Sequence, residues 1–392
     1  MTKNKKVALV VLMIFLVGIV AGCGGSKTGD TSKAGDDTIK VGVIFELSGA
    51  LASYGTSDKN GVMLAIDEIN AAGGINGKKV EPIVVDTKSD PAEATNVAAK
   101  LVDQKVVVIF GPATSGATKA IAPIATRANI PVISPSATAD DVTVANGKVR
   151  EFMFRTCFID SFQGLLAANF AYQELGIKNA AIMTDNSNDY SKGLAKSFEV
   201  QFKKLGGSIV ANEGYVKGDR DFSPTLTKIK SKNPGFIYNP GYYEEVAPAV
   251  KQARELGITV PIAGGDGWGA PQLLETAGKD ALNNTFFTSG YFAQDQDPAV
   301  VKFNADYKKK FNVEPDQFAA LGYDVAKLWA DAVNRAGDAE GVKVAKALAE
   351  TKGFVGVTGK MTIDANHNMS KTGLILEYKD GVQTLKTKIQ PQ

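Results

Sequence analysis

Cysteine and histidine are almost absent from this chain, and their scarcity excludes several kinds of chemistry. The 392 residues contain two cysteines and one histidine, His367, which lies between two asparagines. Such a composition supplies no zinc site built from Cys and His and no disulfide framework. The chain also lacks a Gly-x-Ser-x-Gly nucleophile elbow and a Walker-type phosphate loop. We therefore expect a protein that is not an enzyme and that holds no metal or cofactor.

Long apolar runs are absent as well, with one exception at the N-terminus. Three lysines within the first six residues precede an apolar run from Val7 to Val20, which ends in Ala21-Gly22-Cys23. A transmembrane helix needs about 20 apolar residues, and small residues after a shorter run are typical of a cleaved secretory signal peptide. We expect residues 1–22 to be a signal peptide that directs the chain across the cytoplasmic membrane.

Cys23 ends the tetrapeptide Val20-Ala21-Gly22-Cys23, which resembles the bacterial lipobox. In a lipobox the thiol is acylated and the cysteine becomes the new N-terminus; the alternative is a plain secretory peptide that happens to carry a cysteine. Small and polar residues follow, as in a flexible tether, over residues 23–38. We expect a lipid anchor at Cys23 on the outer face of the membrane, either periplasmic or at the cell surface. Cys157 is then left without a disulfide partner.

An excess of charge of one sign is also missing. Removal of residues 1–22 takes three lysines from the 44 basic residues and none from the 42 acidic residues, which gives a net charge of −1. A near-neutral chain is a poor partner for nucleic acid or for a broad anionic lipid surface. We expect no nucleic-acid partner, and we expect the acyl group alone to hold the protein at the membrane.

Short β-branched runs alternate with longer helical patterns from residue 39 onward, which predicts an α/β fold with parallel sheets. The first half contains expected strands at Ile39–Ile44, Val80–Val85, Val106–Gly111 and Val132–Ser134, and expected helices at Gly61–Ala71, Pro91–Asp103 and Gly116–Ala128. The rhythm restarts after Arg155 and runs to Ala263. The mature chain of about 370 residues exceeds the length at which a single core stops growing, so we expect two lobes.

The end of the chain departs from this rhythm. Beyond Gly290 the pattern is helical over Ala299–Phe311, Asp316–Ala336 and Val342–Thr351, and short strand-like segments follow. We infer that the chain crosses back, so that residues 39–157 and 291–357 form the first lobe and residues 158–290 and 358–392 form the second. Three crossings, near Arg155–Ile159, Phe287–Gly290 and Val357–Ile363, would then form a hinge that closes around a ligand.

Motifs spread over the whole mature chain resemble the periplasmic leucine/isoleucine/valine-type binding proteins of ATP-driven (ABC) importers. They are Lys40–Val43, Leu47-Ser48-Gly49, Tyr54-Gly55, Ile69–Gly77, Asp90-Pro91, Gly111–Ser115, Ile133–Thr138, Arg155-Thr156 and Asp185–Tyr190. The resemblance implies two Rossmann-like lobes of the periplasmic binding protein type I class, with a ligand cleft between them. It also implies a monomer that passes a branched-chain or small aliphatic amino acid to permease and ATPase subunits. One departure is that Ser89 and Thr114 replace a disulfide pair of the enteric members.

An amino acid needs hydrogen-bond donors for its carboxylate. Ser115 opens an expected helix, so its hydroxyl and the free N–H groups nearby suit an anion, although it could simply cap that helix. Thr138 and the backbone of Ser136 follow the strand Val132–Ser134, at the edge where open α/β sheets bind ligands. The resemblance gives both a ligand contact; an ordinary polar turn is the alternative.

The ammonium group and the side chain of an amino acid need an acid and an apolar wall. Asp266 follows the strand Val260–Ala263, at the position where the family pairs an acid with the ammonium; the enteric proteins have glutamate there, and a turn aspartate among glycines is the alternative. For the wall, the resemblance points to aromatic side chains, which otherwise belong to ordinary packing. These are Tyr54, Tyr190, Tyr242 and Phe318, with Trp268 as an additional candidate. We expect the three tyrosines to lie in loops just after or between strands, where binding residues concentrate.

Two other functions are compatible with these residues. Relatives of the family bind amides, urea or aromatic acids, and the same lobes can report ligand occupancy to a membrane receptor. Ser115, Thr138 and Asp266 together favour an α-amino acid, but they do not rank one aliphatic side chain above another.

Overall fold

The computed structural model describes residues 38–390. The predicted signal peptide, Cys23 and nearly all of the tether lie outside these residues. None of the helices in the described range has the length and apolar character that a membrane span requires.

A five-stranded parallel sheet organises the first lobe, in the order β2-β1-β3-β4-β7. Its strands are β1 (Thr38–Phe45), β2 (Lys79–Asp86), β3 (Ile109–Phe110), β4 (Val132–Ser134) and β7 (Met153–Arg155). In β1, Val41 and Val43 are fully buried, and so are Ile44 and Phe45. Burial of consecutive residues means that both faces of the strand are covered, as in α/β proteins with parallel sheets.

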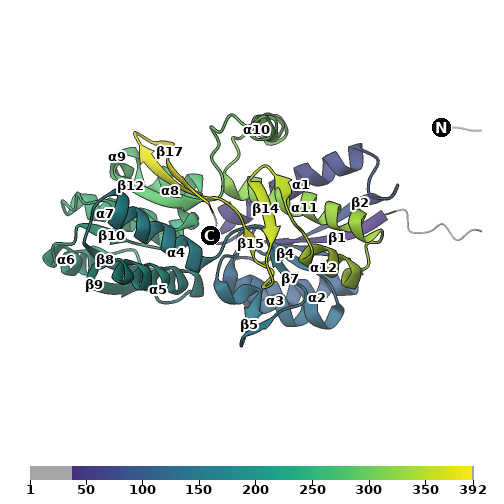
Figure 1. Cartoon of the computed structure of the whole chain (residues 1–392), viewed down its shortest axis with the longest axis horizontal. Helices are drawn as coiled ribbons and strands as arrows, with labels where there is room; N and C mark the ends of the chain where they lie inside the picture. Colours follow the sequence, from purple (N-terminus) through teal and green to yellow (C-terminus); the bar gives the residue numbers. More distant parts are fainter. Residues whose placement is uncertain (1–37, 391–392) are drawn as a thin grey trace, which may run out of the picture. The chain divides into compact units, whose positions relative to one another are not determined.

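Helices from two distant parts of the sequence belong to this lobe (Figure 1). They are α1 (Ala52–Ala71), α2 (Pro91–Asp103), α3 (Ser115–Ala128), α10 (Pro298–Phe311), α11 (Gln317–Ala336) and α12 (Gly341–Ala349). The axes of α1 and α11 approach closely because glycines face the partner helix: a Cβ on Gly61 would lie 1.9 Å from the Ala319 carbonyl oxygen, and one on Gly322 would lie 2.1 Å from the Asp58 carbonyl oxygen. The late helices are therefore an integral part of the first lobe.

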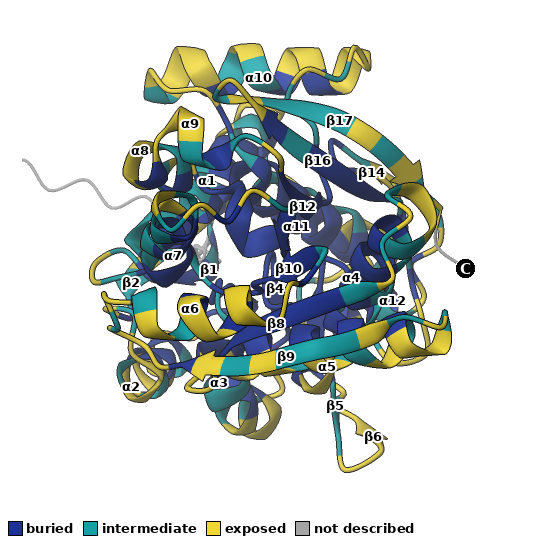
Figure 2. Cartoon of the chain, turned by 90° about the vertical axis from the view of Figure 1, so that its left-hand side faces the viewer, coloured by how far each residue is buried: buried dark blue, intermediate teal, exposed yellow. Residues whose placement is uncertain are grey.

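A seven-stranded sheet organises the second lobe, in the order β17-β16-β12-β11-β10-β8-β9. Its strands are β8 (Asn179–Asp185), β9 (Ser208–Tyr215), β10 (Phe236–Tyr238), β11 (Ile262–Gly264), β12 (Thr285–Ser289), β16 (Gly373–Lys379) and β17 (Val382–Ile389). Strands β8 to β12 are parallel, and β16 and β17 add an antiparallel edge. The strands β8 and β10 are dark blue in Figure 2, whereas exposed residues gather on outer helices.

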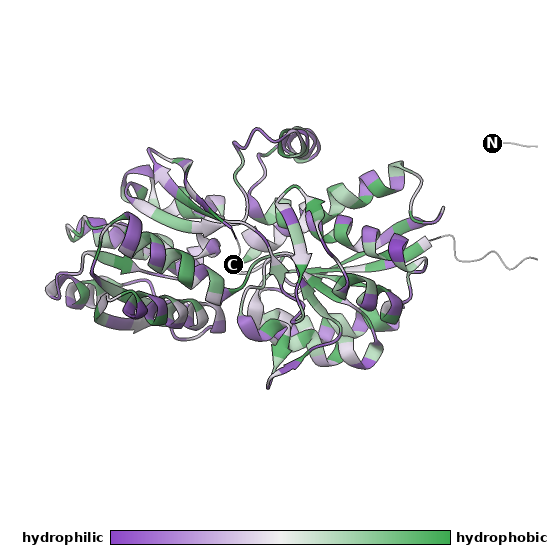
Figure 3. Ribbon diagram, in the orientation of Figure 1, coloured by the Kyte–Doolittle hydropathy of each residue, from purple (hydrophilic) through white to green (hydrophobic). Residues whose placement is uncertain are grey.

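The helices of the second lobe are α4 (Asp160–Asn169), α5 (Asp189–Lys204), α6 (Ser223–Ser231), α7 (Tyr243–Glu255), α8 (Pro271–Ala277) and α9 (Lys279–Leu282). A π-helical turn, Phe170–Glu174, extends α4. In Figure 3 hydrophobic residues gather on the strands, while α10 on the first lobe is mostly hydrophilic. This distribution is expected where helices cover the faces of a buried sheet.

The last crossing between the lobes comes later than the sequence predicts. The strands β13 (Phe354–Gly356), β14 (Gly359–Ile363) and β15 (Met369–Ser370) form their own sheet. Directly before β15, Asn368 accepts a hydrogen bond from Thr143, and His367 stacks on Phe154 of β7. The expected crossing near 357–363 is therefore wrong. Residues 359–363 form β14, which pairs with β13 and β15, and the chain joins the sheet of the second lobe only at β16.

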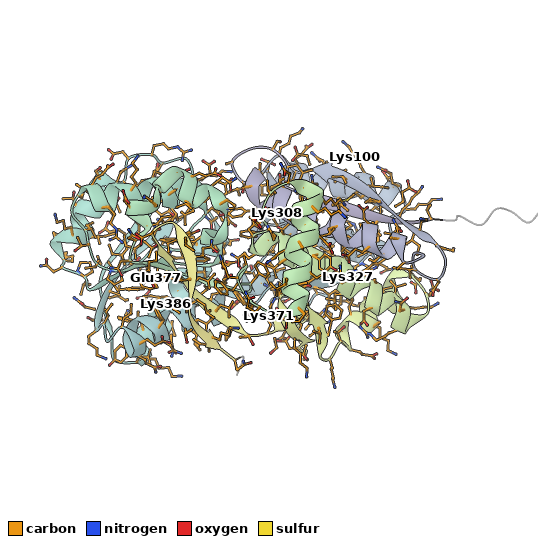
Figure 4. The ribbon with its side chains drawn as sticks, turned by 90° about the horizontal axis from the view of Figure 1, so that it is seen from above. Lys100, Lys308, Lys327, Lys371, Glu377 and Lys386 are labelled. Carbon is orange, nitrogen blue, oxygen red and sulfur yellow. The ribbon has the colours of Figure 1, made fainter. Side chains whose placement is uncertain are left out.

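Lys371 lies at this last crossing and contacts the other two connections. Its side chain is 1% exposed; the ammonium donates to the Thr156 carbonyl at 3.4 Å and to the Thr358 hydroxyl. A Cβ on Gly290 would lie 3.5 Å from the ammonium nitrogen. Burial lowers the pKa of Lys371 to about 8. Figure 4 labels this lysine on the yellow C-terminal ribbon, where the chain passes between the lobes.

Candidate ligand-binding site

A small cavity of about 10 Å³, room for about one water molecule, has walls from both lobes. Six of the eight side chains predicted from the sequence line it: Tyr54, Ser136, Tyr190, Tyr242, Asp266 and Phe318. The remaining lining residues, which the sequence interpretation missed, are Ala113, Thr114 and Gly267. Small residues next to a predicted site residue carry little signal of their own, and only the fold places them in the wall.

Ser115 and Thr138, the other two predicted residues, do not line this cavity. The Ser115 hydroxyl oxygen accepts a hydrogen bond from the Ala139 N–H at 3.1 Å, so its own proton is free for another acceptor. The Thr138 side chain is fully buried, and its hydroxyl has no hydrogen-bond partner among the described residues. Both hydroxyls are therefore able to donate to a ligand.

The N-terminus of α3 provides free N–H groups beside the cavity. Glu46 accepts hydrogen bonds from the N–H groups of Ala113 and Thr114, at 3.0 and 3.2 Å. Within the described chain, the next two N–H groups, of Ser115 and Gly116, donate to no acceptor. Unpaired N–H groups at a helix start form a natural anion site. This end of the cavity suits a carboxylate.

Ser136 uses its hydroxyl within the first lobe. The hydroxyl donates to the Asp58 carboxylate, with a separation of 2.8 Å. The main-chain atoms of Ser136 are left for a ligand, which is the role expected for this segment.

Asp266 presents a buried carboxylate from the second lobe. Its Oδ1 accepts hydrogen bonds from the Tyr190 hydroxyl at 2.9 Å and from the Gln163 amide at 3.0 Å. The Gln163 side chain also accepts from the Asp266 N–H at 2.9 Å, so it fixes the orientation of this residue. Both donors go to Oδ1, and Oδ2 accepts no hydrogen bond from a described residue. Burial raises the pKa of Asp266 to about 6, which the two hydrogen bonds oppose. The carboxylate is therefore ionised near neutral pH and suits an ammonium group.

Aromatic rings form the rest of the wall. Tyr190 and Tyr242 stack with centroids 5.0 Å apart and planes 2° apart, and Tyr54 lies 4.6 Å from Phe318 between ring centroids. We expected the three tyrosines in loops, but Tyr54 and Tyr190 lie in the first turns of α1 and α5, and Tyr242 caps α7. The loop prediction was wrong because each helix begins earlier than its apolar pattern suggests.

Tyr54 also connects the two lobes. Its hydroxyl donates to the Gly267 carbonyl at 2.6 Å and accepts from the Tyr243 N–H at 3.0 Å. Both partners belong to the second lobe, whereas Tyr54 belongs to α1. The hydroxyl therefore holds the cleft closed in this structure.

Trp268 does not line the cavity. It is fully buried, and its indole N–H donates to the Asn239 carbonyl at 3.1 Å. A Cβ on Gly264 would lie 1.9 Å from the indole nitrogen, so the glycine is needed for the ring to pack there. The additional wall candidate is thus a core residue.

The two hydroxyl residues at the disulfide positions of the enteric relatives hold their loops by hydrogen bonds instead. Ser89 accepts from the Leu51 N–H at 3.1 Å and donates to the Ser48 carbonyl at 2.7 Å. Thr114 donates to Glu46 at 2.7 Å. Hydrogen bonding therefore fixes both segments beside the cleft.

Comparison with known proteins places these features in a family. A profile of the periplasmic binding protein family matches residues 38–383. A leucine-, isoleucine-, valine-, threonine- and alanine-binding protein of Pseudomonas aeruginosa is 29% identical over 89% of this chain and 92% of its own length. A Leu/Ile/Val-binding protein of Rhizobium johnstonii is 32% identical over 87% of this chain and 91% of its own.

Solved structures share the whole fold. The branched-chain amino acid transporter substrate-binding protein LivJ from Streptococcus pneumoniae, in complex with isoleucine, is 43% identical with a TM-score of 0.83 and covers 90% of this chain and 98% of its own. The leucine-binding protein LivK from Thermotoga maritima is 37% identical with a TM-score of 0.85, over 90% and 99%. A solute-binding protein from Rhodopseudomonas palustris, in complex with 3,4-dihydroxybenzoic acid, is 27% identical with a TM-score of 0.81, over 91% and 98%. The resemblance inferred from the sequence is confirmed: this chain belongs to the periplasmic binding protein family.

Proposed function

We propose that this protein captures a branched-chain or small aliphatic amino acid in the cleft between its lobes and delivers it to an ABC importer. The observation that carries the proposal is the chemistry of the two ends of the cavity. Free N–H groups of α3 lie at one end, and the Asp266 carboxylate lies at the other, on the opposite lobe. A zwitterion is held by both ends at once, so its binding favours closure of the cleft.

The wall between these ends supports an apolar side chain. Tyr54, Tyr190, Tyr242 and Phe318 supply aromatic surface, and Tyr190 is itself held by Asp266. Relatives that bind leucine, isoleucine and valine are 29–43% identical to this chain. An aliphatic side chain suits an apolar wall of this kind.

Aromatic acids are the second candidate, because one relative holds 3,4-dihydroxybenzoic acid. Asp266 argues against them. An acid without an ammonium group would leave the Asp266 carboxylate buried without a counter-charge, which is unfavourable.

Membrane attachment is part of the proposal. We infer that Cys23 is acylated and that the tether places the lobes beside the permease as a monomer. Labelling of cells with a radioactive fatty acid should mark the wild-type protein and not Cys23→Ser. Release of Cys23→Ser from the membrane fraction is the accompanying result; an unlabelled wild type would mean a plain secretory peptide.

A thermal-shift screen tests the ligand. The compact unit begins at Asp37, so a protein starting at Gly24 keeps it whole. The twenty amino acids are compared with urea, simple amides and 3,4-dihydroxybenzoate; we expect an increase in melting temperature with leucine, isoleucine or valine. Asp266→Asn should reduce the increase strongly at equal ligand concentration, whereas Glu275→Gln, which changes an exposed acid of α8, should preserve it. A response to urea, an amide or the benzoate alone would refute the amino-acid assignment.

A further inference from the structure

Asp160 carries a buried carboxylate that no residue of the described chain satisfies. It is the first residue of α4 and is 1% exposed, and neither carboxylate oxygen has a hydrogen-bond partner. Two neighbouring hydroxyls, of Thr138 and Tyr238, are likewise buried without a partner. Buried polar groups in native proteins are nearly always paired, so a cluster of this kind points to a partner outside the chain, either a ligand or an ordered water.

The main chain fixes Asp160 beside the binding site. Its N–H donates to the Thr138 carbonyl at 2.9 Å, which ties α4 to the segment that ends the cavity wall. One turn along α4, Gln163 orients Asp266. Asp160 and Asp266 are also close enough for their charges to repel each other. The two carboxylates therefore belong to one region of the cleft.

Protein atoms cover the Asp160 carboxylate oxygens. Asp160 also borders an open groove between Asp140 and α5, but its two oxygens are inaccessible to solvent. A Cβ on Gly193 of α5 would lie 2.8 Å from Oδ2, so the helix seals that side. An exposed cation in the groove cannot reach the oxygens without displacing this cover.

Arg155, a buried cation whose charge acts on Asp160, makes no hydrogen bond to it, and its Nε has no partner among the described residues. Its guanidinium donates to the carbonyl oxygens of Ala137 and Ala139, at 2.8 and 2.9 Å, and to Thr143. These bonds tie Arg155 to the first lobe. Burial raises the pKa of Asp160 well above its usual range; the Thr138 hydroxyl lowers it in part, although the two make no hydrogen bond of normal geometry.

We infer that Asp160 is a second acceptor for the ammonium group of the captured amino acid, together with Asp266 and the Thr138 hydroxyl. This inference rests on the proposed function and deepens it. An ammonium group has three N–H donors, and Asp266 has one free oxygen. Asp160 and Thr138 supply the other acceptors. The second carboxylate makes the site specific for amino acids over carboxylic acids of the same shape, because only an ammonium group satisfies it.

Calorimetric titration of leucine and of 4-methylpentanoate, which is leucine without its amino group, tests the inference. Asp160→Asn should weaken leucine binding at least tenfold, because a charged partner is lost, and should leave 4-methylpentanoate unchanged or tighter. Glu46→Gln is the matched control: it also neutralises a buried carboxylate, and it should leave the ratio of the two affinities unchanged. A leucine affinity within twofold of wild type, or equal weakening of both ligands, would overturn the inference.

Thr138→Val gives an independent variant of nearly the same shape. We expect it to weaken leucine more than 4-methylpentanoate, by about three- to tenfold in the ratio. If Asp160→Asn fails to fold, this ratio decides; an unchanged ratio contradicts the shared ammonium site.

Proton release provides a second measurement. Burial raises the pKa of Asp160, and an ammonium group bound to it lowers that pKa again, so leucine binding should release protons in the pH range where Asp160 titrates. The enthalpy of leucine binding, measured over a range of pH, should therefore vary with the ionisation enthalpy of the buffer, and this variation should be smaller in Asp160→Asn. Equal proton release in both proteins would count against Asp160. If the wild-type protein binds no amino acid at all, the proposed function is wrong. If the wild type binds leucine and Asp266→Asn does not, an unchanged leucine affinity in Asp160→Asn contradicts only the inference about Asp160.

Discussion

Two buried carboxylates on opposite sides of the cleft, Glu46 in the first lobe and Asp160 in the second, have opposite surroundings. Glu46 is fully buried and accepts from two N–H groups and the Thr114 hydroxyl. Asp160 is buried to nearly the same extent and accepts from no described residue. A carboxylate that is satisfied inside its own lobe stabilises that lobe whether the cleft is open or closed. One without partners stabilises nothing until a ligand supplies the donors.

Asp266 is intermediate between them. One of its oxygens is held by Tyr190 and Gln163, and the other is free. The second lobe therefore orients one acid and leaves part of it available. We therefore predict that substitutions of the three acids differ in how much they lower the stability of the fold and how much they lower the affinity for the ligand.

Removal of Glu46 should give the largest effect on stability. Glu46→Ala leaves the N–H groups of Ala113 and Thr114 buried without an acceptor, and we expect the free energy of unfolding to fall by about 3 kcal/mol. Asp160→Ala also removes a carboxylate, although one methylene less than Glu46→Ala, and it breaks no side-chain hydrogen bond. The free energy of unfolding should therefore fall by less than about 1 kcal/mol. Urea denaturation of the ligand-free variants measures both. Equal losses would show that hydrogen bonding does not distinguish the two acids.

Removal of Asp266 should give the largest effect on binding. Asp266→Asn leaves an amide that is isosteric with the acid and still able to accept from Tyr190, so the fold should persist. The ammonium loses its charged partner, and we expect leucine affinity to fall by about 30- to 100-fold. Isothermal titration measures the change. A loss no greater than that of Asp160→Asn would reverse the ranking of the two acids.

The pH dependence follows from the raised pKa of Asp266, about 6 in the free protein. The protonated acid cannot pair with an ammonium, so leucine affinity should fall by up to tenfold per pH unit below pH 6. The pH dependence of stability has the opposite sign to that of leucine affinity. A folded pKa above the unfolded value of about 3.9 means that the contribution of Asp266 is greatest below pH 4 and is lost as the pH rises through 6. Binding titrations and thermal melts from pH 4 to 8 should show both pH dependences, that of leucine affinity and that of stability. In Asp266→Asn the part of each dependence that comes from this carboxylate should be missing.

The elements that the sequence predicts best are those with local signals. The bounds expected for α2 are those observed, because Asp90 caps the helix and Pro91 is its first residue. The start of α1 was placed nine residues too late, at Gly61 instead of Ala52. Gly55 and Gly61 weaken a helical pattern, yet each is there for a tertiary contact: a Cβ on Gly55 would lie 2.2 Å from the Glu46 carbonyl oxygen.

The site divides in the same way. Asp266 and the aromatic wall are recognisable from residue type and motif, and the structure brings them into one cavity. Asp160 and Gln163 are not recognisable, because a polar residue at a helix start is usually a cap or a solvated residue. Their importance depends on which donors surround them, and only the fold determines that. Gln163 on the apolar face of α4, three residues before the buried Leu166, is the one available hint.

The smallest effect should come from an ion pair between the lobes at the edge of the cleft. Lys119 of α3 lies 2.5 Å from Asp189 of α5 and 2.9 Å from Asp141 of its own lobe. Asp189 is about half exposed, so water and salt screen the attraction, and Lys119→Met should accelerate leucine release by about two- to fivefold. Lys192→Met is the control, because Lys192 pairs with the same acid at 2.8 Å within α5 and does not bridge the lobes. Stopped-flow release at low salt should separate the two variants, and the difference should shrink in 1 M NaCl. Equal acceleration in both would mean that Asp189 acts through its own helix and that closure depends on the buried carboxylates rather than on the surface charges.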